Sequence, residues 1–186
     1  MTGMATDIML FGAGTAAVAW FSRKPLRCPG SHGFYRFFAW EGILALWVMN
    51  RGAWGKDPSS VHQLIAWPLL SVSFALVMLG VLALVRYGDV TGQREGAALY
   101  EWEKTTTLVT RGIFAHIRHP MYASLLALAW AALLEAPSWP GTAIACGVTL
   151  LLLVMVFAEE RECLDYFGAA YADYMRRTWR IIPGVF

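Results

Sequence analysis

The apolar residues of this chain gather into five long blocks that are separated by polar segments. The blocks cover residues 8–21, 37–49, 64–85, 120–134 and 142–158. A helix that crosses a membrane needs about 20 predominantly apolar residues, and these blocks approach or reach that length. The pattern therefore predicts an all-α fold: a multi-pass transmembrane helical bundle of about five spans, forming one integral-membrane domain over 1–186. The breaker-rich turn 135–141 should make the last two spans an antiparallel hairpin.

The pattern changes after the last apolar block. Residues 159–180 alternate apolar and charged positions with helical spacing, which predicts an amphipathic C-terminal helix. Its apolar face collects Leu164, Phe167, Tyr171, Tyr174 and Met175. Glu160 falls on that apolar face, whereas Glu159 falls with the charged residues. Because a buried carboxyl group needs a partner, we expect Arg118, His119 or a bound cation to face Glu160.

Composition supports the membrane class and narrows the chemistry. Charged residues make up 15% of the chain and hydrophobic residues 58%, whereas soluble domains carry about 25% charged residues. We expect no nucleic-acid partner. The three cysteines include no C-x-x-C pair, and Cys28 with His32 forms only half of a metal site. Neither a disulfide framework nor a metal centre is predicted.

The placement of the basic residues predicts an orientation. Of the 15 Lys and Arg residues, 13 lie in the first loop, the third loop and the C-terminal segment, which share one side of a five-span bundle. Positive charge favours the cytoplasmic side of a membrane. The N-terminus is therefore predicted outside, with the C-terminus and the adjoining loops in the cytoplasm.

One polar stretch, 111–122, stands at the start of the fourth block and holds the densest candidate chemistry. It contains Arg111, His116, Arg118, His119 and Tyr122. Pro120 suits the first turn of a helix and pushes the preceding residue into extended geometry, so the helix should begin near Pro120. The free N–H groups of its first turn would favour an anion. A ligand site and simple anchoring of Arg, His and Tyr at the membrane interface both remain open at this point.

The C-terminal half resembles a known family. The motif is Leu108-Val109-Thr110-x-Gly112-Ile113-x4-Arg118-His119-Pro120-x-Tyr122, then Glu159-Glu160, Phe167-Gly168-x2-Tyr171-x2-Tyr174 and Arg180-Ile181-Ile182-Pro183. It resembles the isoprenylcysteine carboxyl methyltransferases, which group with the phospholipid methyltransferases as integral-membrane enzymes that use S-adenosylmethionine. The resemblance covers about 105–183 and leaves 1–104 matched only as transmembrane.

The resemblance implies a cofactor-binding half, 105–186, and an N-terminal half, 1–104, that gives the acceptor access. The residues implied in S-adenosylmethionine binding are Arg118, His119, Pro120, Tyr122, Glu159, Glu160, Tyr171, Tyr174 and Arg180. Arg118 and His119 suit the carboxylate of the cofactor. Glu160 suits its ammonium group or a ribose hydroxyl. Tyrosine rings could pack on the adenine or attract the sulfonium.

The implied activity is methyl transfer to a lipophilic or membrane-embedded acceptor, similar to an isoprenylcysteine carboxylate or a lipid, at the cytoplasmic face. The candidate catalytic residues are Arg118, Glu160 and His116. A carboxylate acceptor needs no base, whereas an amine or phenol would, and His116 or Glu101 could serve. A Gly-Thr-Gln-like element found in many prenylcysteine enzymes is missing, so prenylated proteins are not the expected substrate. A small amphipathic thiol or amine stays open.

Two other functions compete with methyl transfer. Membrane reductases of the sterol C14-reductase type, which use NADPH, share a similar tail. The Glu159-Glu160 pair and the order Phe167-Gly168-x2-Tyr171 favour methyl transfer over reduction. A non-enzymatic scaffold would have little reason to keep Glu160 buried, because such a group costs about 2.5–3.5 kcal/mol on insertion scales.

Overall fold

The computed structural model describes residues 2–89 and 106–186, and within them the chain is helical, as predicted. Six α-helices follow in order: α1 (Thr2–Phe21), α2 (His32–Asn50), α3 (Val61–Tyr87), α4 (Pro120–Glu135), α5 (Trp139–Phe167) and α6 (Ala169–Met175). Two 3₁₀ turns, η1 (Pro25–Arg27) and η3 (Gly112–Ala115), precede α2 and α4. Glu101, the second candidate base, lies outside the described residues.

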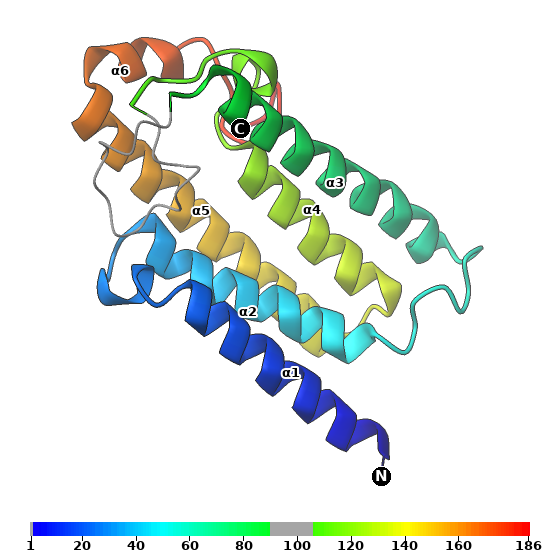
Figure 1. Cartoon of the computed structure of the whole chain (residues 1–186). Helices are drawn as coiled ribbons and strands as arrows, with labels where there is room; N and C mark the ends of the chain where they lie inside the picture. Colours follow the sequence, from blue (N-terminus) through cyan, green and yellow to red (C-terminus); the bar gives the residue numbers. More distant parts are fainter. Residues whose placement is uncertain (1, 90–105) are drawn as a thin grey trace.

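The five long helices lie side by side in an elongated bundle, and α6 covers one end of it (Figure 1). The principal packing pairs are α3 with α4 and α2 with α5, while α1 packs on the outside against α2. The N-terminus lies at the end remote from α6, and the C-terminus folds back beside the start of α4 (Figure 1). Helices α4 and α5 therefore run between these two ends of the bundle.

Helix α2 shows why these helices pack so closely. Its innermost residues lie at intervals of four, three, seven and four positions, which places them in one stripe along the helix; they include His32, Arg36, Ala39, Leu46 and Asn50. Gly42 faces α5 so closely that a Cβ atom there would collide with Val148. Small residues let helix backbones approach, and this glycine sets the contact between α2 and α5.

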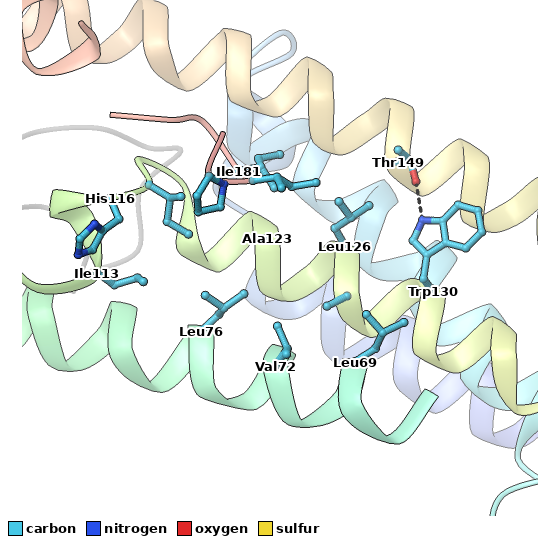
Figure 2. A pocket seen from close by; sticks show the side chains of 14 residues that line it. Leu69, Val72, Leu76, Ile113, His116, Ala123, Leu126, Trp130, Thr149 and Ile181 are labelled. Carbon is cyan, nitrogen blue, oxygen red and sulfur yellow. Dashed lines mark hydrogen bonds between the residues drawn. The ribbon is translucent and has the colours of Figure 1, made fainter. Parts of the chain in front are cut away.

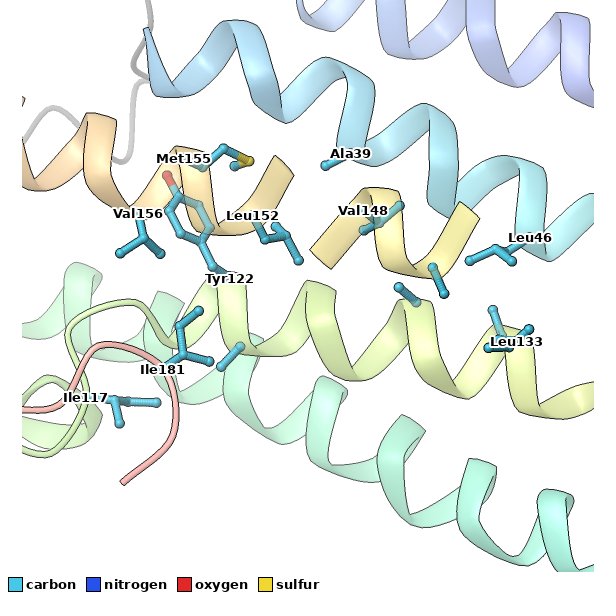
Figure 3. Packing of buried hydrophobic residues seen from close by; sticks show 14 residues of the cluster. Ala39, Leu46, Ile117, Tyr122, Leu133, Val148, Leu152, Met155, Val156 and Ile181 are labelled. Atoms are coloured by element: carbon cyan, nitrogen blue, oxygen red, sulfur yellow. The ribbon is translucent and has the colours of Figure 1, made fainter. Parts of the chain in front are cut away.

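The core of the bundle lies between α2, α4 and α5 (Figure 3). Large apolar side chains such as Leu46, Leu152 and Met155 fill it. Helix α4 contributes mainly buried alanines, which bring its backbone close to its neighbours; these are Ala123, Ala127, Ala129, Ala131 and Ala132. The hairpin of α4 and α5 that was predicted is confirmed by their packing.

Three helices in the described part of the chain are long and apolar enough to cross a membrane. They comprise Gly3–Phe21, Val61–Tyr87 and Trp139–Phe167, and the shorter apolar helix Pro120–Glu135 has 16 residues. Large apolar side chains on these helices remain exposed, for example Phe74 at 68% and Val85 at 70%, as expected of surfaces that lipid covers. The count of five spans stays a prediction.

The predicted amphipathic helix over 159–180 is wrong in its extent. Helix α5 runs without interruption from the apolar block to its last residue, Phe167. Gly168 follows with φ of 57° and ψ of −130°, which few other residues adopt. Helix α6 spans only seven residues, and the chain beyond Met175 is not helical. The helical wheel also misplaced Leu164 on the buried face. Leu164 is 36% exposed, while its neighbour Cys163 is buried.

Candidate active site at the start of α4

The site begins with a backbone contact between two distant segments. Residues 116–119 form an irregular segment whose backbone pairs with residues 179–180 of the tail, which we define as residues 176–186. The N–H of Arg118 donates to the carbonyl of Trp179 at 2.8 Å, and the N–H of His119 donates to the carbonyl of Arg180 at 3.0 Å. Helix α4 then starts at Pro120, as the sequence predicted. This pairing fixes the tail over the start of α4.

Glu160 is the centre of a buried ionic cluster, which we define as Arg118, His119, Glu159, Glu160 and Arg180. Its side chain is 5% exposed, and its Oε1 accepts from Nε of Arg118 at 2.9 Å. Nε of Arg180 donates to Oε2 at 3.0 Å. The inward position of Glu160 is therefore as predicted, Arg118 is one of the partners that the sequence left open, and Arg180 is a second partner.

Arg118 uses its remaining donors on the tail. Its Nη1 donates to the carbonyl oxygens of Met175, at 3.1 Å, and of Thr178. The Thr178 hydroxyl in turn donates to the Tyr174 carbonyl at 2.8 Å. Since all three guanidinium nitrogens of Arg118 have partners within the protein, this residue joins α5, α6 and the tail.

His119 lies between the two carboxylates. Its Nδ1 is 3.4 Å from Glu159 Oε2, and its Nε2 is 3.6 Å from Glu160 Oε1, too long for a hydrogen bond. Its ring stacks parallel to the ring of Tyr122, with centroids 5.4 Å apart. Burial opposes protonation of the imidazole, but the two carboxylates outweigh it and raise the pKa of His119 above its ordinary value. The two carboxylates therefore stabilise the protonated form of His119 relative to the neutral form.

The two predicted tyrosines, Tyr171 and Tyr174, lie on α6 and are buried. Their rings contact each other with centroids 5.8 Å apart, and the Tyr174 hydroxyl donates to the Phe114 carbonyl at 2.6 Å. Burial raises the pKa of both Tyr171 and Tyr174, so both phenols stay neutral. Tyr174 thereby holds α6 against η3.

Two cavities adjoin this region, and they differ in size. A pocket of about 30 Å³ is bordered by Phe114, Arg118, His119, Pro120, Met121, Tyr122 and Glu159, and has room for about one water molecule. A much larger cavity of about 610 Å³ lies between α3, α4, α5 and the tail (Figure 2). Its wall is almost entirely apolar, and we call it the apolar cavity. His116 borders it at the end nearest the ionic cluster.

Sequence reasoning missed the contribution of α2. His32, 1% exposed, stands at the first turn of α2, and its Nδ1 lies 2.6 Å from Glu162 Oε2. The backbone N–H of His32 also donates to Glu162, at 3.1 Å. The pair ties the start of α2 to α5 beside Glu159. Two signals in the sequence could have indicated this position of His32. Ser31 caps the start of α2, and His32 has helical spacing with the inner stripe of that helix.

Comparison with known proteins extends the resemblance that the motifs showed. The phospholipid methyltransferase family matches residues 61–170, which adds α3 to the part of the chain predicted from motifs and leaves the last residues outside. Similar proteins are methanethiol S-methyltransferase 2 of Bradyrhizobium diazoefficiens, 26% identical over 140 residues, and methanethiol S-methyltransferase of Crocosphaera subtropica, 24% identical over 132 residues. These alignments cover 72% and 70% of this chain but 53% and 50% of the relatives.

The chain thus spans about half the length of the curated relatives it matches. No solved structure matches it. The family match, in contrast, covers more than half of the chain and includes the Arg-His-Pro segment, α4 and the Glu159-Glu160 pair. This protein therefore belongs to the phospholipid methyltransferase family.

Proposed function

We propose that this protein transfers a methyl group from S-adenosylmethionine to a lipophilic or membrane-embedded acceptor at the cytoplasmic face of a membrane. One observation carries the proposal. The short segment 116–123 borders the ionic cluster on one side and the apolar cavity on the other. An enzyme that brings a charged donor to an apolar acceptor needs such a junction, and the family membership supplies the reaction class.

The donor set fits S-adenosylmethionine. This cofactor carries an ammonium group, a carboxylate, hydroxyls and a sulfonium. Glu159, whose side chain is 29% exposed, borders the small pocket and can accept from an ammonium group or a hydroxyl. Within the described part of the chain the buried Nε2 of His119 has no hydrogen-bond partner, and the N–H groups at the start of α4 favour a carboxylate. Arg180, whose side chain is 30% exposed, reaches the same cluster from the tail.

The roles of the predicted residues divide accordingly. Glu159, His119, Pro120 and Tyr122 would hold the cofactor, while Arg118, Glu160, Tyr171 and Tyr174 fix the elements around it. When bound, S-adenosylmethionine supplies an activated methyl group on its sulfonium. The protein contributes position and the exclusion of water, which suit a displacement that neutralises charge.

His116 is our candidate for a base that receives a proton from the acceptor. It borders the apolar cavity, the residue is exposed, and its imidazole ring has no hydrogen-bond partner among the residues described. The two relatives are named for methanethiol, a thiol, which loses its proton when it is methylated. Carboxylate, lipid-like and thiol acceptors therefore remain the candidates, and His116 matters only for those that carry a proton.

Ligand binding and turnover together test the proposal. We expect S-adenosylhomocysteine to bind the detergent-extracted protein in calorimetry, and NADPH not to bind. Radiolabelled S-adenosylmethionine should transfer label to apolar thiols, carboxylates or lipids presented in mixed micelles. Binding of NADPH without S-adenosylhomocysteine would favour the sterol-reductase alternative. No binding of either would contradict an enzymatic function at this site.

A further inference from the structure

The two ends of the apolar cavity differ in chemistry. At one end lies His116, an exposed residue whose imidazole ring has no hydrogen-bond partner among the described residues. At the other lie Leu69, Trp130 and Thr149 (Figure 2). There the Trp130 Nε1 donates to Thr149 Oγ1 at 3.2 Å, and Thr149 Oγ1 donates to the Ala145 carbonyl at 2.8 Å. Both polar groups at the remote end are thus satisfied, so that end offers an occupant only apolar surface.

The dimensions of the cavity limit what fits. Along α4 its wall runs from Ala123 to Trp130, which at 1.5 Å per residue is about 10 Å. The volume of about 610 Å³ lies inside the range of roughly 300–1,000 Å³ that is typical of small-molecule sites. The wall residue Val72 is 48% exposed, so the cavity reaches the apolar outer surface of the bundle. An apolar molecule can therefore enter from the side.

We propose that the apolar cavity binds one apolar chain of the acceptor, with its polar reactive head at His116, and that Trp130 limits the length of this chain. The occupant is a single-chain amphiphile, because one end of the cavity presents an available polar group and the other is closed by a satisfied indole. The position of the head rests on the proposed function. The binding of the chain does not, and it can be measured without any methyl transfer.

Methyl n-alkyl sulfides of increasing length are suitable probes, because they carry a methylated head and cannot be methylated further when no S-adenosylmethionine is added. Binding to the full chain in detergent would be followed by thermal shift and expressed against free aqueous concentration. The affinity should rise about fourfold for each methylene buried, then stop rising when the chain reaches Trp130. In Trp130→Ala the rise should continue to longer chains. Trp130→Phe, a milder change, should move the limit by a smaller amount.

Trp139→Ala is the matched control, because Trp139 is 89% exposed and lies outside the cavity. It should keep the limit of the wild type. An unchanged limit in both Trp130 variants, or displacement of the sulfides by an equal concentration of a two-chain phospholipid, would overturn the assignment. Sulfide binding with the expected limit but no methylation of any acceptor would leave the cavity assignment standing and refute the proposed function. Methylation of an acceptor together with an unchanged chain-length limit in the Trp130 variants would support the proposed function and refute the cavity assignment.

Discussion

The adjacent glutamates Glu159 and Glu160 have different surroundings, and their substitution separates structure from binding. Glu160 is enclosed by Arg118 and Arg180, so Glu160→Gln leaves two guanidinium groups without a counter-charge. Breaking a buried ion pair costs about 3–5 kcal/mol, and we expect a lower melting temperature with and without S-adenosylhomocysteine. Glu159→Gln removes one counter-charge of His119 and should lower the melting temperature less than Glu160→Gln does, but it should bind S-adenosylhomocysteine at least about tenfold more weakly.

This expectation reverses the one from the helical wheel, which gave Glu160 to the cofactor and Glu159 to solvent. The reason is that Arg118 and Arg180 already occupy both oxygens of Glu160, whereas Glu159 borders the small pocket. Melting curves and calorimetry on both variants decide between the two assignments. If Glu160→Gln melted normally and lost binding, the wheel assignment would be right.

His119 should make the stability of the protein depend on pH. The pKa of His119 is raised above its ordinary value of 6.5 in the folded protein by Glu159 and Glu160, despite burial. A raised pKa contributes stability that is complete below the unfolded pKa, near 6.5, and is lost as the pH rises through the higher folded pKa. The difference in melting temperature between wild type and His119→Gln should therefore be largest at about pH 6 and shrink at alkaline pH. A difference that grew with pH would contradict a charged His119.

At the scale of the elements, the break between α5 and α6 depends on one glycine. Gly168 has φ of 57° and ψ of −130°, and no atom lies within 4 Å of where its Cβ would be. Gly168→Ala should therefore be destabilising through backbone strain alone, by about 1–3 kcal/mol. Gly147 in the middle of α5 also has open space around a Cβ. Gly147→Ala should be stabilising by about 0.5–1 kcal/mol, because alanine favours helix.

Thermal melting of the two alanine variants in the same detergent checks this expectation. Opposite signs support a strained turn that sets the direction of α6 and hence the positions of Tyr171 and Tyr174. Equal changes in melting temperature for the two variants would mean that residue 168 can connect α5 to α6 with other backbone angles.

At the scale of the whole molecule, the charge distribution predicts the orientation in the membrane. Trp139 lies at the start of α5 and Arg177 in the tail, and both are exposed. In a cysteine-free background, Trp139→Cys should react with a membrane-impermeant maleimide on intact cells. Arg177→Cys should react only after permeabilisation, because 13 of the 15 basic residues place the tail in the cytoplasm. Labelling of both positions from outside would refute the five-span arrangement.

Several features were predictable from the sequence because local rules control them. Long apolar blocks can satisfy their backbone groups in lipid only as helices, so the helical class followed from hydropathy. Pro120 fixed the start of α4 through its own geometry. The burial of Glu160 followed from helical spacing, and the cost of burying an isolated charge required a partner, for which Arg118 was one of three candidates. The family motif lies in these same elements.

Other features exist only in the folded chain, because they join residues far apart in sequence. The tail pairs with residues 116–119, Arg180 becomes the second partner of Glu160, and His32 meets Glu162 from the other half of the chain. The apolar cavity likewise needs α3, α4, α5 and the tail at once. Periodicity places a side chain on a face of its own helix but does not choose the neighbour of that face. That choice depends on how the helices pack, and here it places Glu160 between two arginines and leaves Glu159 at the border of the small pocket.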